Sequence, residues 1–372
     1  MSNYHDLRSN RRYLMGPGPS DVHARVLKAM STPMIGHLDP EFVTIMDDIK
    51  AMVKHTLRTD NDLTFVVSAP GSAGMETCLV NLLEPGDEAV ICINGVFGTR
   101  MADIAERCGA KVIKVESPWG QPILPEQVEL ILKTCSPKLV AVVHAETSTG
   151  VKSPIDEIAP LVHQAGALMV VDAVTSWCGL DIRVDEWGID AIYSGSQKCL
   201  SAPPGLSPVS FSAKAVETIE KRKTKVQSWF MDLNLVRSYW SGSKRTYHHT
   251  GPVSAMFAMR EALRLVVEED IDDRIVRHYH HHLLLRGELE KLGMEFLVAE
   301  PYRLPMLNAV RIPDGVDDMI VRTKLLNEYG IEIGAGLGQF SGRIWRIGLM
   351  GESSTPGHIN LLVAALNQII NR

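Results

Sequence analysis

The sequence lacks most of the features that mark membrane, secreted or metal-binding proteins. No apolar run in its 372 residues approaches the roughly 20 residues of a membrane-spanning helix. Residues 1–8 lack the apolar core of a secretory signal, and residues 368–372 are not a peroxisomal Ser-Lys-Leu address. The six cysteines form no Cys-x-x-Cys pair, which argues against a zinc or redox motif. We therefore expect a cytoplasmic protein that contacts no membrane and binds no metal.

An excess of basic charge is also lacking. The 38 lysines and arginines are outnumbered by 44 acidic residues, and the net charge of -6 gives no electrostatic reason to expect nucleic-acid binding. No Gly-x-Gly-x-x-Gly follows a strand-like run, which argues against a NAD-dependent dehydrogenase. No Gly-x-x-x-x-Gly-Lys-Ser/Thr occurs either, so a nucleotide P-loop is disfavoured.

What the sequence does contain is a regular alternation of strand-like and helix-like stretches from residue 21 to about residue 210. Helix-like stretches such as 74–83 and 99–108 separate the apolar runs and end at glycine or Glu-Pro-Gly. The strand-like runs are 63–68, 89–93, 111–115, 139–143, 167–171, 191–193 and 208–211. Alternation at this spacing predicts the α/β class, with a mostly parallel, doubly wound sheet.

The pattern changes after residue 211. Residues 253–269 have the periodicity of one long amphipathic helix, and a charged break follows at residues 270–274. Helix, strand and helix signals then continue to the end of the chain. We predict an N-terminal arm (1–20), a large domain (21–269) and a smaller C-terminal α+β domain (270–372), for which the chain is long enough.

Three of the predicted strands end in polar groups: Thr147, Asp172 and Lys198. The carboxyl edge of strands in an open α/β sheet is where ligands bind. A lysine and an aspartate that meet at this edge suggest pyridoxal phosphate, because the lysine would form a Schiff base and the aspartate would pair with the pyridinium nitrogen. The sequence therefore predicts a cofactor site here.

Lys198 and Asp172 each have a simpler explanation. A lysine in a loop is usually a solvated surface residue, but here Ser-Gly-Ser-Gln precedes it and Ala-Pro-Pro-Gly follows at 202–205, which holds the backbone stiffly. Burial would lower the pKa of such a lysine and make it useful for proton transfer. Asp172 alone could be a helix N-cap. Its position one strand before Lys198 favours a charge-assisted bond to a cofactor.

Three further positions suit an anionic, planar ligand. Gly71 and Ser72 lie between a strand and a helix, where glycine allows close approach and the helix N-terminus favours a phosphate. Phe97 follows the next strand and can stack on a flat ring, with packing at the edge of the core as the alternative. Arg346 alternates with apolar residues in 343–348, so it can bind a carboxylate or form an interdomain salt bridge.

Two histidine-rich stretches and one cysteine are open to functional or structural interpretation. The run at 278–282 lies in a helix-like stretch, where adjacent side chains point in different directions, so we do not expect a metal site there. Cys199 follows Lys198, and buried packing is favoured over a catalytic thiol. The Tyr-His-His-Thr sequence at 247–250 precedes Gly-Pro in a predicted loop, and composition alone does not explain it.

Together these residues resemble the class V, fold type I aminotransferases that depend on pyridoxal 5'-phosphate, most of all the alanine–glyoxylate and serine–pyruvate enzymes. The resemblance runs from residues 16–20 to residues 346–348. Its most specific motifs are Tyr-Ser-Gly-Ser-Gln-Lys at 193–198, Ala-Pro-Pro-Gly at 202–205, Tyr-His-His-Thr at 247–250 and Met-Ile-Gly at 34–36.

The resemblance implies a role for each residue of these motifs. Lys198 would be the catalytic Schiff-base lysine, and Asp172 would be the catalytic partner of the ring nitrogen. Tyr247 and Thr250 would reach the cofactor phosphate from the other subunit, which implies a homodimer with shared active sites. The remaining cofactor contacts would be Gly71, Ser72, Phe97, Thr147 and Gln197, and the substrate would be held by Arg346, Gly36 and Thr147.

The chain departs from the family pattern at two points. Phe97 stands where relatives often have tryptophan, and Pro-Gly-Ser at 70–72 stands where they often have Ser-Gly-His. Gln197 precedes the lysine where the cysteine desulfurases of this class have histidine, which argues against desulfurization.

The resemblance implies ping-pong transamination between a small amino acid, alanine or serine, and a small 2-oxo acid, glyoxylate or pyruvate. Pyridoxamine–pyruvate and ureidoglycine–glyoxylate aminotransferases are alternatives within the class. The phosphate-suited turn at Gly71 and Ser72 argues against the first of these, because pyridoxamine carries no phosphate. A non-catalytic, cofactor-binding regulatory protein is the alternative from a different class.

Overall fold

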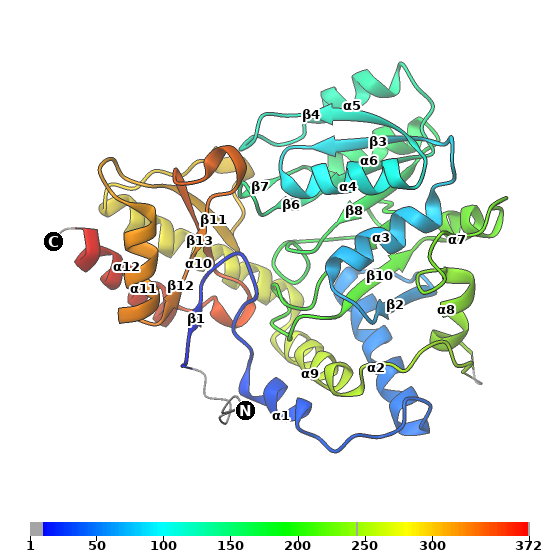
Figure 1. The fold of residues 1–372 in the computed structure, drawn as a ribbon, viewed down its shortest axis with the longest axis horizontal. Helices are drawn as coiled ribbons and strands as arrows, with labels where there is room; N and C mark the ends of the chain where they lie inside the picture. The colour runs from blue at the N-terminus through cyan, green and yellow to red at the C-terminus, as the bar shows by residue number, and fades with distance from the viewer. Residues whose placement is uncertain (1–9, 243–244, 371–372) are drawn as a thin grey trace, which may run out of the picture.

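The computed structural model describes residues 10–242 and 245–370, and the larger part of the molecule is built on one seven-stranded sheet (Figure 1). The strand order is β2-β10-β9-β8-β5-β3-β4, and only β10 runs antiparallel to its neighbours. The strands are β2 (Leu63–Val67), β3 (Glu88–Ile93), β4 (Lys111–Glu116), β5 (Leu139–Val143), β8 (Leu168–Asp172), β9 (Ala191–Tyr193) and β10 (Ser207–Phe211). The predicted α/β class and mostly parallel sheet are confirmed.

Helices cover both faces of this sheet, since every residue of β5 and β8 is buried. The helices are α1 (Ala24–Met30), α2 (Pro40–Leu57), α3 (Gly71–Leu82), α4 (Val96–Arg107), α5 (Pro125–Leu132), α6 (Ile155–Gln164), α7 (Ala213–Glu220), α8 (Leu233–Trp240) and α9 (Val253–Glu269). The local sequence explains where helix α2 begins. The Asp39 side chain accepts a hydrogen bond from the Glu41 N–H at 2.8 Å, and Pro40 occupies the first turn of α2.

The C-terminal part forms a second, smaller unit around its own cluster of buried apolar residues. Its antiparallel sheet has the order β11-β14-β13. The elements are α10 (Ile271–Lys291), β11 (Leu307–Arg311), α11 (Asp318–Glu328), β13 (Gly334–Ala335), β14 (Ile344–Gly348), α12 (Pro356–Ile370) and single 3₁₀ turns at Glu300–Tyr302, Gly338–Phe340 and Gly351–Ser353. The domain limits at residues 21 and 270 stay a prediction.

The described part of the N-terminal arm lies between these two units. Strand β1 (Tyr13–Leu14) pairs in parallel with β12 (Ile331–Glu332), and Met15 belongs to the apolar cluster of the C-terminal part. Ser20 Oγ then donates a hydrogen bond to the Lys198 carbonyl at 2.8 Å. A short hairpin of β6 (Ala145–Glu146) and β7 (Val151–Lys152) extends from the carboxyl end of β5. None of the helices within 10–242 and 245–370 could cross a membrane.

Candidate active site

Lys198 lies just beyond the carboxyl end of β9 and is 9% exposed. Its ammonium donates a hydrogen bond to the Pro17 carbonyl, and burial lowers the pKa of the amine to about 8. Gly18, with φ +106, allows the N-terminal segment to approach this closely, because a Cβ there would lie 2.7 Å from Lys198 Nζ. The side chain therefore supplies a free amine at mildly alkaline pH without leaving the protein interior.

Asp172 is the last residue of β8 and is paired in register with Tyr193 of β9. Its Oδ1 accepts a hydrogen bond from the Val174 N–H at 2.8 Å, and Oδ2 accepts one from the Tyr193 hydroxyl at 2.8 Å. Burial raises the pKa of this carboxyl to about 6, although both hydrogen bonds oppose the rise. No cation among the described residues forms an ion pair with it. A protonated pyridine nitrogen would supply the missing positive charge.

A potential phosphate site lies at the N-terminus of α3. The helix begins at Gly71, and Pro70 before it makes no side-chain cap, so first-turn N–H groups remain available to an anion. A Cβ on Gly71 would lie 3.1 Å from Val174 Cγ2, within the turn that follows Asp172. Ser72 Oγ accepts a hydrogen bond from Arg100 Nη1 at 3.0 Å, which adds a cation to this end of the helix.

Gln197 connects this anion site to the lysine. A Cβ on Gly195 would lie 3.5 Å from Val174 Cγ1 and 2.9 Å from Gln197 Oε1, so the residues before Lys198 pack close to the turn after Asp172. Gln197 Oε1 is buried and has no hydrogen-bond partner. A bound group that carries a donor would satisfy it. Gly71, Ser72 and Gln197 are thus brought toward the same end of the sheet as Lys198 and Asp172.

The adjacent α4 terminus is organised by Glu146, which the sequence reasoning missed. Glu146 is fully buried and accepts hydrogen bonds from the Phe97 N–H at 3.0 Å and from Ser148 Oγ at 2.6 Å. Burial raises the pKa of this carboxyl. The Phe97 ring is partly buried and lies 5.1 Å from the Arg100 guanidinium. The position of Glu146 directly before Thr147 is the sequence feature from which its role could have been predicted.

Arg346 projects from β14 toward the large domain and is 8% exposed. Its Nε donates to the Ala335 carbonyl at 2.7 Å, and Nη1 donates to the Thr147 carbonyl at 3.2 Å. Burial lowers its pKa to about 10, which leaves the guanidinium charged at neutral pH. Within the described residues Arg346 forms no ion pair, so the salt-bridge alternative is wrong. The buried charge is free to bind a substrate carboxylate.

Gly36, Tyr247 and Thr250 differ from the residues above because all three are exposed. Tyr247 is 59% exposed, and its ring lies 5.4 Å from the His37 ring in an edge-to-face contact. No contact among the described residues joins these three to Lys198 or Asp172. One chain therefore does not bring them into its own site, and their predicted roles would require a second copy.

The Cys199 thiol is buried beside the lysine, and burial raises its pKa to about 12. Its Sγ donates to the Thr175 carbonyl at 3.3 Å. A thiol that remains protonated and enclosed serves packing, as favoured from the sequence.

Comparison with known proteins extends these observations to the whole chain. Residues 12–342 match the family described as Aminotransferase class-V. The chain is 36% identical to the (S)-ureidoglycine–glyoxylate transaminase of Bacillus subtilis, with 100% of this chain and 94% of the relative covered. It is 39% identical to the alanine–glyoxylate aminotransferase of Felis catus, with 97% and 88% covered. The crystal structure of a Nostoc alanine–glyoxylate aminotransferase superposes with a TM-score of 0.97 at 43% identity, covering 99% of this chain and 97% of that one.

Proposed function

Because this chain belongs to the class-V aminotransferases, which depend on pyridoxal phosphate, we propose that it transfers the amino group of alanine or serine to glyoxylate or pyruvate. Glyoxylate is named as a substrate of all three relatives described above, which supports it as an acceptor. Family membership also argues against the non-catalytic alternative considered from the sequence. A cytoplasmic location remains part of the proposal.

The residues at the sheet edge fit the cofactor. When bound, pyridoxal phosphate supplies an aldehyde for a covalent link to lysine and a ring that withdraws electrons. Asp172 would hold the proton of the ring nitrogen, because no cation in the described part of the chain forms an ion pair with its buried carboxylate. The α3 terminus and Ser72 would hold the phosphate, with the side-chain amide N–H of Gln197 as a further donor, and Phe97 would stack on the ring face.

Lys198 and Arg346 would have different roles toward the substrate, proton transfer and carboxylate binding. The Lys198 amine, with its pKa near 8, is suited to take the proton from the substrate Cα as a general base and to return a proton as a general acid. Arg346 would fix the carboxylate and so orient the Cα–H bond. One observation carries the proposal most directly. The Arg346 guanidinium is buried, forms no ion pair with any residue that the structure describes, and its charge helps lower the Lys198 pKa.

We also propose a homodimer in which each site is completed by the partner's Tyr247, Thr250 and Gly36. The exposure of these residues in one chain supports this arrangement. Large apolar side chains near these residues are also exposed: Met34, two residues before Gly36, at 73%, and Trp229, which stacks on the His248 ring, at 63%. Such side chains are typical of surfaces that a second subunit covers.

Ureidoglycine–glyoxylate transamination is a second candidate. The Bacillus subtilis relative with that name aligns along the whole of this chain at 36% identity, close to the 39% of the alanine–glyoxylate enzyme. Both candidates share the acceptor and differ in the donor. Pyridoxamine as the donor remains a weaker alternative, because the α3 terminus suits a phosphate.

A single half-reaction would test the donor. The yellow holoenzyme is mixed with alanine, serine, (S)-ureidoglycine or pyridoxamine, and bleaching is followed in a stopped-flow spectrometer; glyoxylate or pyruvate is then added to restore the colour. We expect fast bleaching by alanine or serine and recovery with glyoxylate, which is the ping-pong pattern. Fast bleaching by (S)-ureidoglycine alone would replace the proposed donor. A protein that no amino donor bleaches would contradict transamination altogether.

A further inference from the structure

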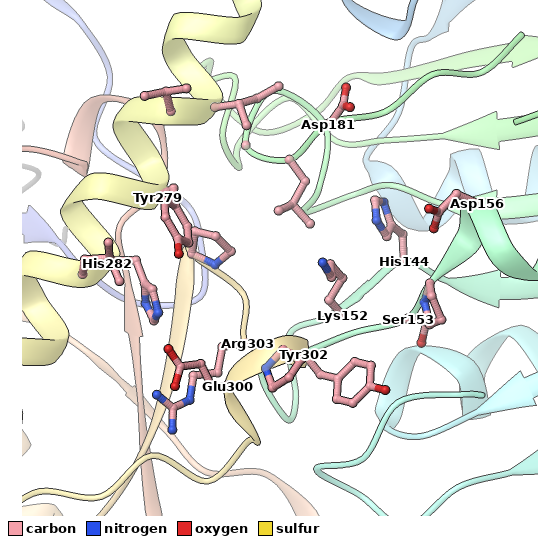
Figure 2. Close-up of a pocket in the computed structure, with 18 of the residues that line it drawn as sticks. His144, Lys152, Ser153, Asp156, Asp181, Tyr279, His282, Glu300, Tyr302 and Arg303 are labelled. Atoms are coloured by element: carbon pink, nitrogen blue, oxygen red, sulfur yellow. The ribbon is translucent and has the colours of Figure 1, made fainter. Parts of the chain in front are cut away.

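A second cleft, of about 900 Å³, lies between the two units of the chain and contains none of the predicted site residues (Figure 2). One wall comes from the large domain and includes His144, Lys152 and Trp187. The other comes from α10 and from the segment before β11, with Tyr279, His282 and Tyr302 among its residues. A molecule bound here would touch both units at once.

Lys152 and Arg303 both line this cleft, and neither forms an ion pair with a described residue. The Arg303 Nε donates to the Val298 carbonyl at 2.8 Å and the guanidinium lies 4.6 Å from the Phe296 ring, although its Nη1 is buried without a partner. Lys152 ends β7 and is half-buried, and its side chain makes no hydrogen bond or ion pair with any described residue. Figure 2 shows its amine extending into the open space of the cleft. An anionic ligand would supply the missing partner.

The carboxylates that line the same cleft do not fill that role. Asp181 forms ion pairs with Arg58 at 2.5 Å and with Arg183 at 2.9 Å. Glu300 forms an ion pair with Arg286 at 2.5 Å. Each of these two charges is therefore balanced before any ligand arrives.

The other two acidic residues of the lining belong to a helix terminus. Asp156 and Glu157 are exposed in the first turn of α6, where no side chain caps the helix and the dipole stabilises negative charge. Neither lies within ion-pair distance of Lys152. Among the described residues, Lys152 and Arg303 consequently remain the charges of the cleft that no ion pair balances.

His144 adds a buried polar group with no partner. The side chain is 3% exposed, and its Nδ1 is enclosed without a hydrogen bond. Burial, assisted by the charge of Lys152, lowers the pKa of the ring to about 3, so the ring is neutral at physiological pH. A neutral imidazole carries one N–H donor, and no described residue accepts from it. The ring also contacts Trp187 edge-to-face at 5.9 Å, which fixes its position.

The rest of the cleft is suited to an apolar body. Leu180 and Trp187 lie on the large-domain side, and Tyr279 and Leu283 lie on α10. Tyr279 is 51% exposed and Leu283 is 39% exposed, so each has apolar surface to bury. Figure 2 shows Tyr279 and His282 across the opening from Lys152 and His144.

We propose that this cleft is a second ligand site, separate from the substrate site, for a small organic carboxylate with an aromatic or branched apolar body. The carboxylate would bind the Lys152 ammonium and the His144 N–H. The apolar body would lie between Trp187 and Tyr279. Because the ligand bridges both units, its binding would stabilise their relative position.

Calorimetry on the holoenzyme would test this site, with benzoate as the anionic probe and benzamide as its uncharged isostere. We expect benzoate to bind, and benzamide to bind at least about tenfold more weakly because it lacks the charge. Lys152→Met should weaken benzoate binding at least about tenfold, and Lys152→Arg should largely retain it. The matched control is Lys133→Met, which removes an exposed lysine that pairs with Glu129 and should leave binding unchanged.

Benzoate could also bind to Arg346 in the substrate site. The Arg346→Lys variant distinguishes the two sites, because it should not alter the affinity of the cleft for benzoate. The proposal fails if benzoate produces no heat, if benzamide binds equally well, or if Lys152→Met binds normally. It also fails if Arg346→Lys, rather than Lys152→Met, abolishes the signal. Thermal unfolding of each variant, compared with wild type, would show that a loss of binding does not come from misfolding.

Discussion

The buried edge of the large sheet and the exposed loop that contains Tyr247 differ in how completely one chain satisfies their side chains. Lys198 and Asp172 at this edge, and Arg346 of β14 in the smaller unit, are all buried, and each makes hydrogen bonds within its own chain. Tyr247 and Thr250 are exposed and are held by few such contacts. In the proposed homodimer, the reactive groups would be fixed within one subunit, whereas the groups that close the site would come from its partner.

The strongest test of the buried group is Lys198→Ala. We expect kcat to fall by about 10³-fold or more, since a general acid–base contributes about 10²–10⁴-fold and the covalent link to the cofactor is also lost. Steady-state assays and the absorbance of the purified protein would measure both effects. The exposed Lys133→Ala is the control and should be normal. A variant that stays yellow and turns over within tenfold of wild type would refute the role of Lys198.

Asp172→Asn should give the next largest loss, about 10²–10³-fold in kcat, because a preorganised charge at the ring nitrogen disappears. Asparagine can retain the hydrogen bonds to Val174 and Tyr193. Single-turnover kinetics at saturating cofactor would separate this effect from weaker cofactor binding. An unchanged half-reaction rate would show that the carboxylate does not act on the ring.

The same substitution should stabilise the apo-protein at neutral pH. The folded-state pKa of Asp172, about 6, lies above its unfolded value of about 4, so the stability it contributes is present below about pH 4 and is lost as pH rises through 6. Above pH 6 the buried charge costs up to about 3 kcal/mol. Urea unfolding of both apo-proteins at pH 4 and pH 7 should show the Asp172→Asn advantage only at pH 7. If Asp172→Asn raised the free energy of unfolding equally at pH 4 and pH 7, the stabilisation would not come from removing the buried charge.

Arg346→Lys should cost about 10–100-fold in kcat/KM, as expected for one charged hydrogen bond of about 1.5–3 kcal/mol. Lysine keeps the charge but cannot contact Ala335, Thr147 and a carboxylate together. Initial rates over a range of amino-donor concentrations would show whether kcat or the KM for the donor changes. The absorbance of the bound cofactor should not change, and a variant that loses its colour would indicate a structural role instead.

The smallest effect is expected for the exposed loop. Tyr247→Phe should weaken cofactor affinity by about 5–10-fold through the loss of one hydroxyl contact. Titration of the apo-protein would measure it. Tyr329→Phe is the control, since that hydroxyl bonds to Gln368 on the surface. Dilution of the wild-type protein to monomers should also weaken cofactor binding, because the partner's Tyr247 would be lost. An unchanged cofactor affinity after dilution would show that the two subunits do not share their sites.

The fold and much of the site could be predicted because their signals are local. An apolar run that ends in a polar residue shows both the strand and the position of its carboxyl end, as for Asp172. Glu146 and Arg100 were missed because their roles depend on distant partners. Glu146 binds the backbone of Phe97, 49 residues away, and Arg100 binds Ser72, 28 residues away. The hydrophobic periodicity of a short stretch of sequence does not reveal contacts between residues so far apart.

The N-terminal segment that encloses Lys198 also sets the order in which the site can form during synthesis. Met15 accepts a hydrogen bond from the Gly348 N–H at 2.7 Å and donates one to the Glu332 carbonyl at 2.9 Å. Met15 thus finds these partners only after residues 332–348 have been synthesised. The lysine can be synthesised, and its strand can pair, long before Gly18 is held against it. The cofactor pocket would therefore be completed only after residue 348 has been added to the chain.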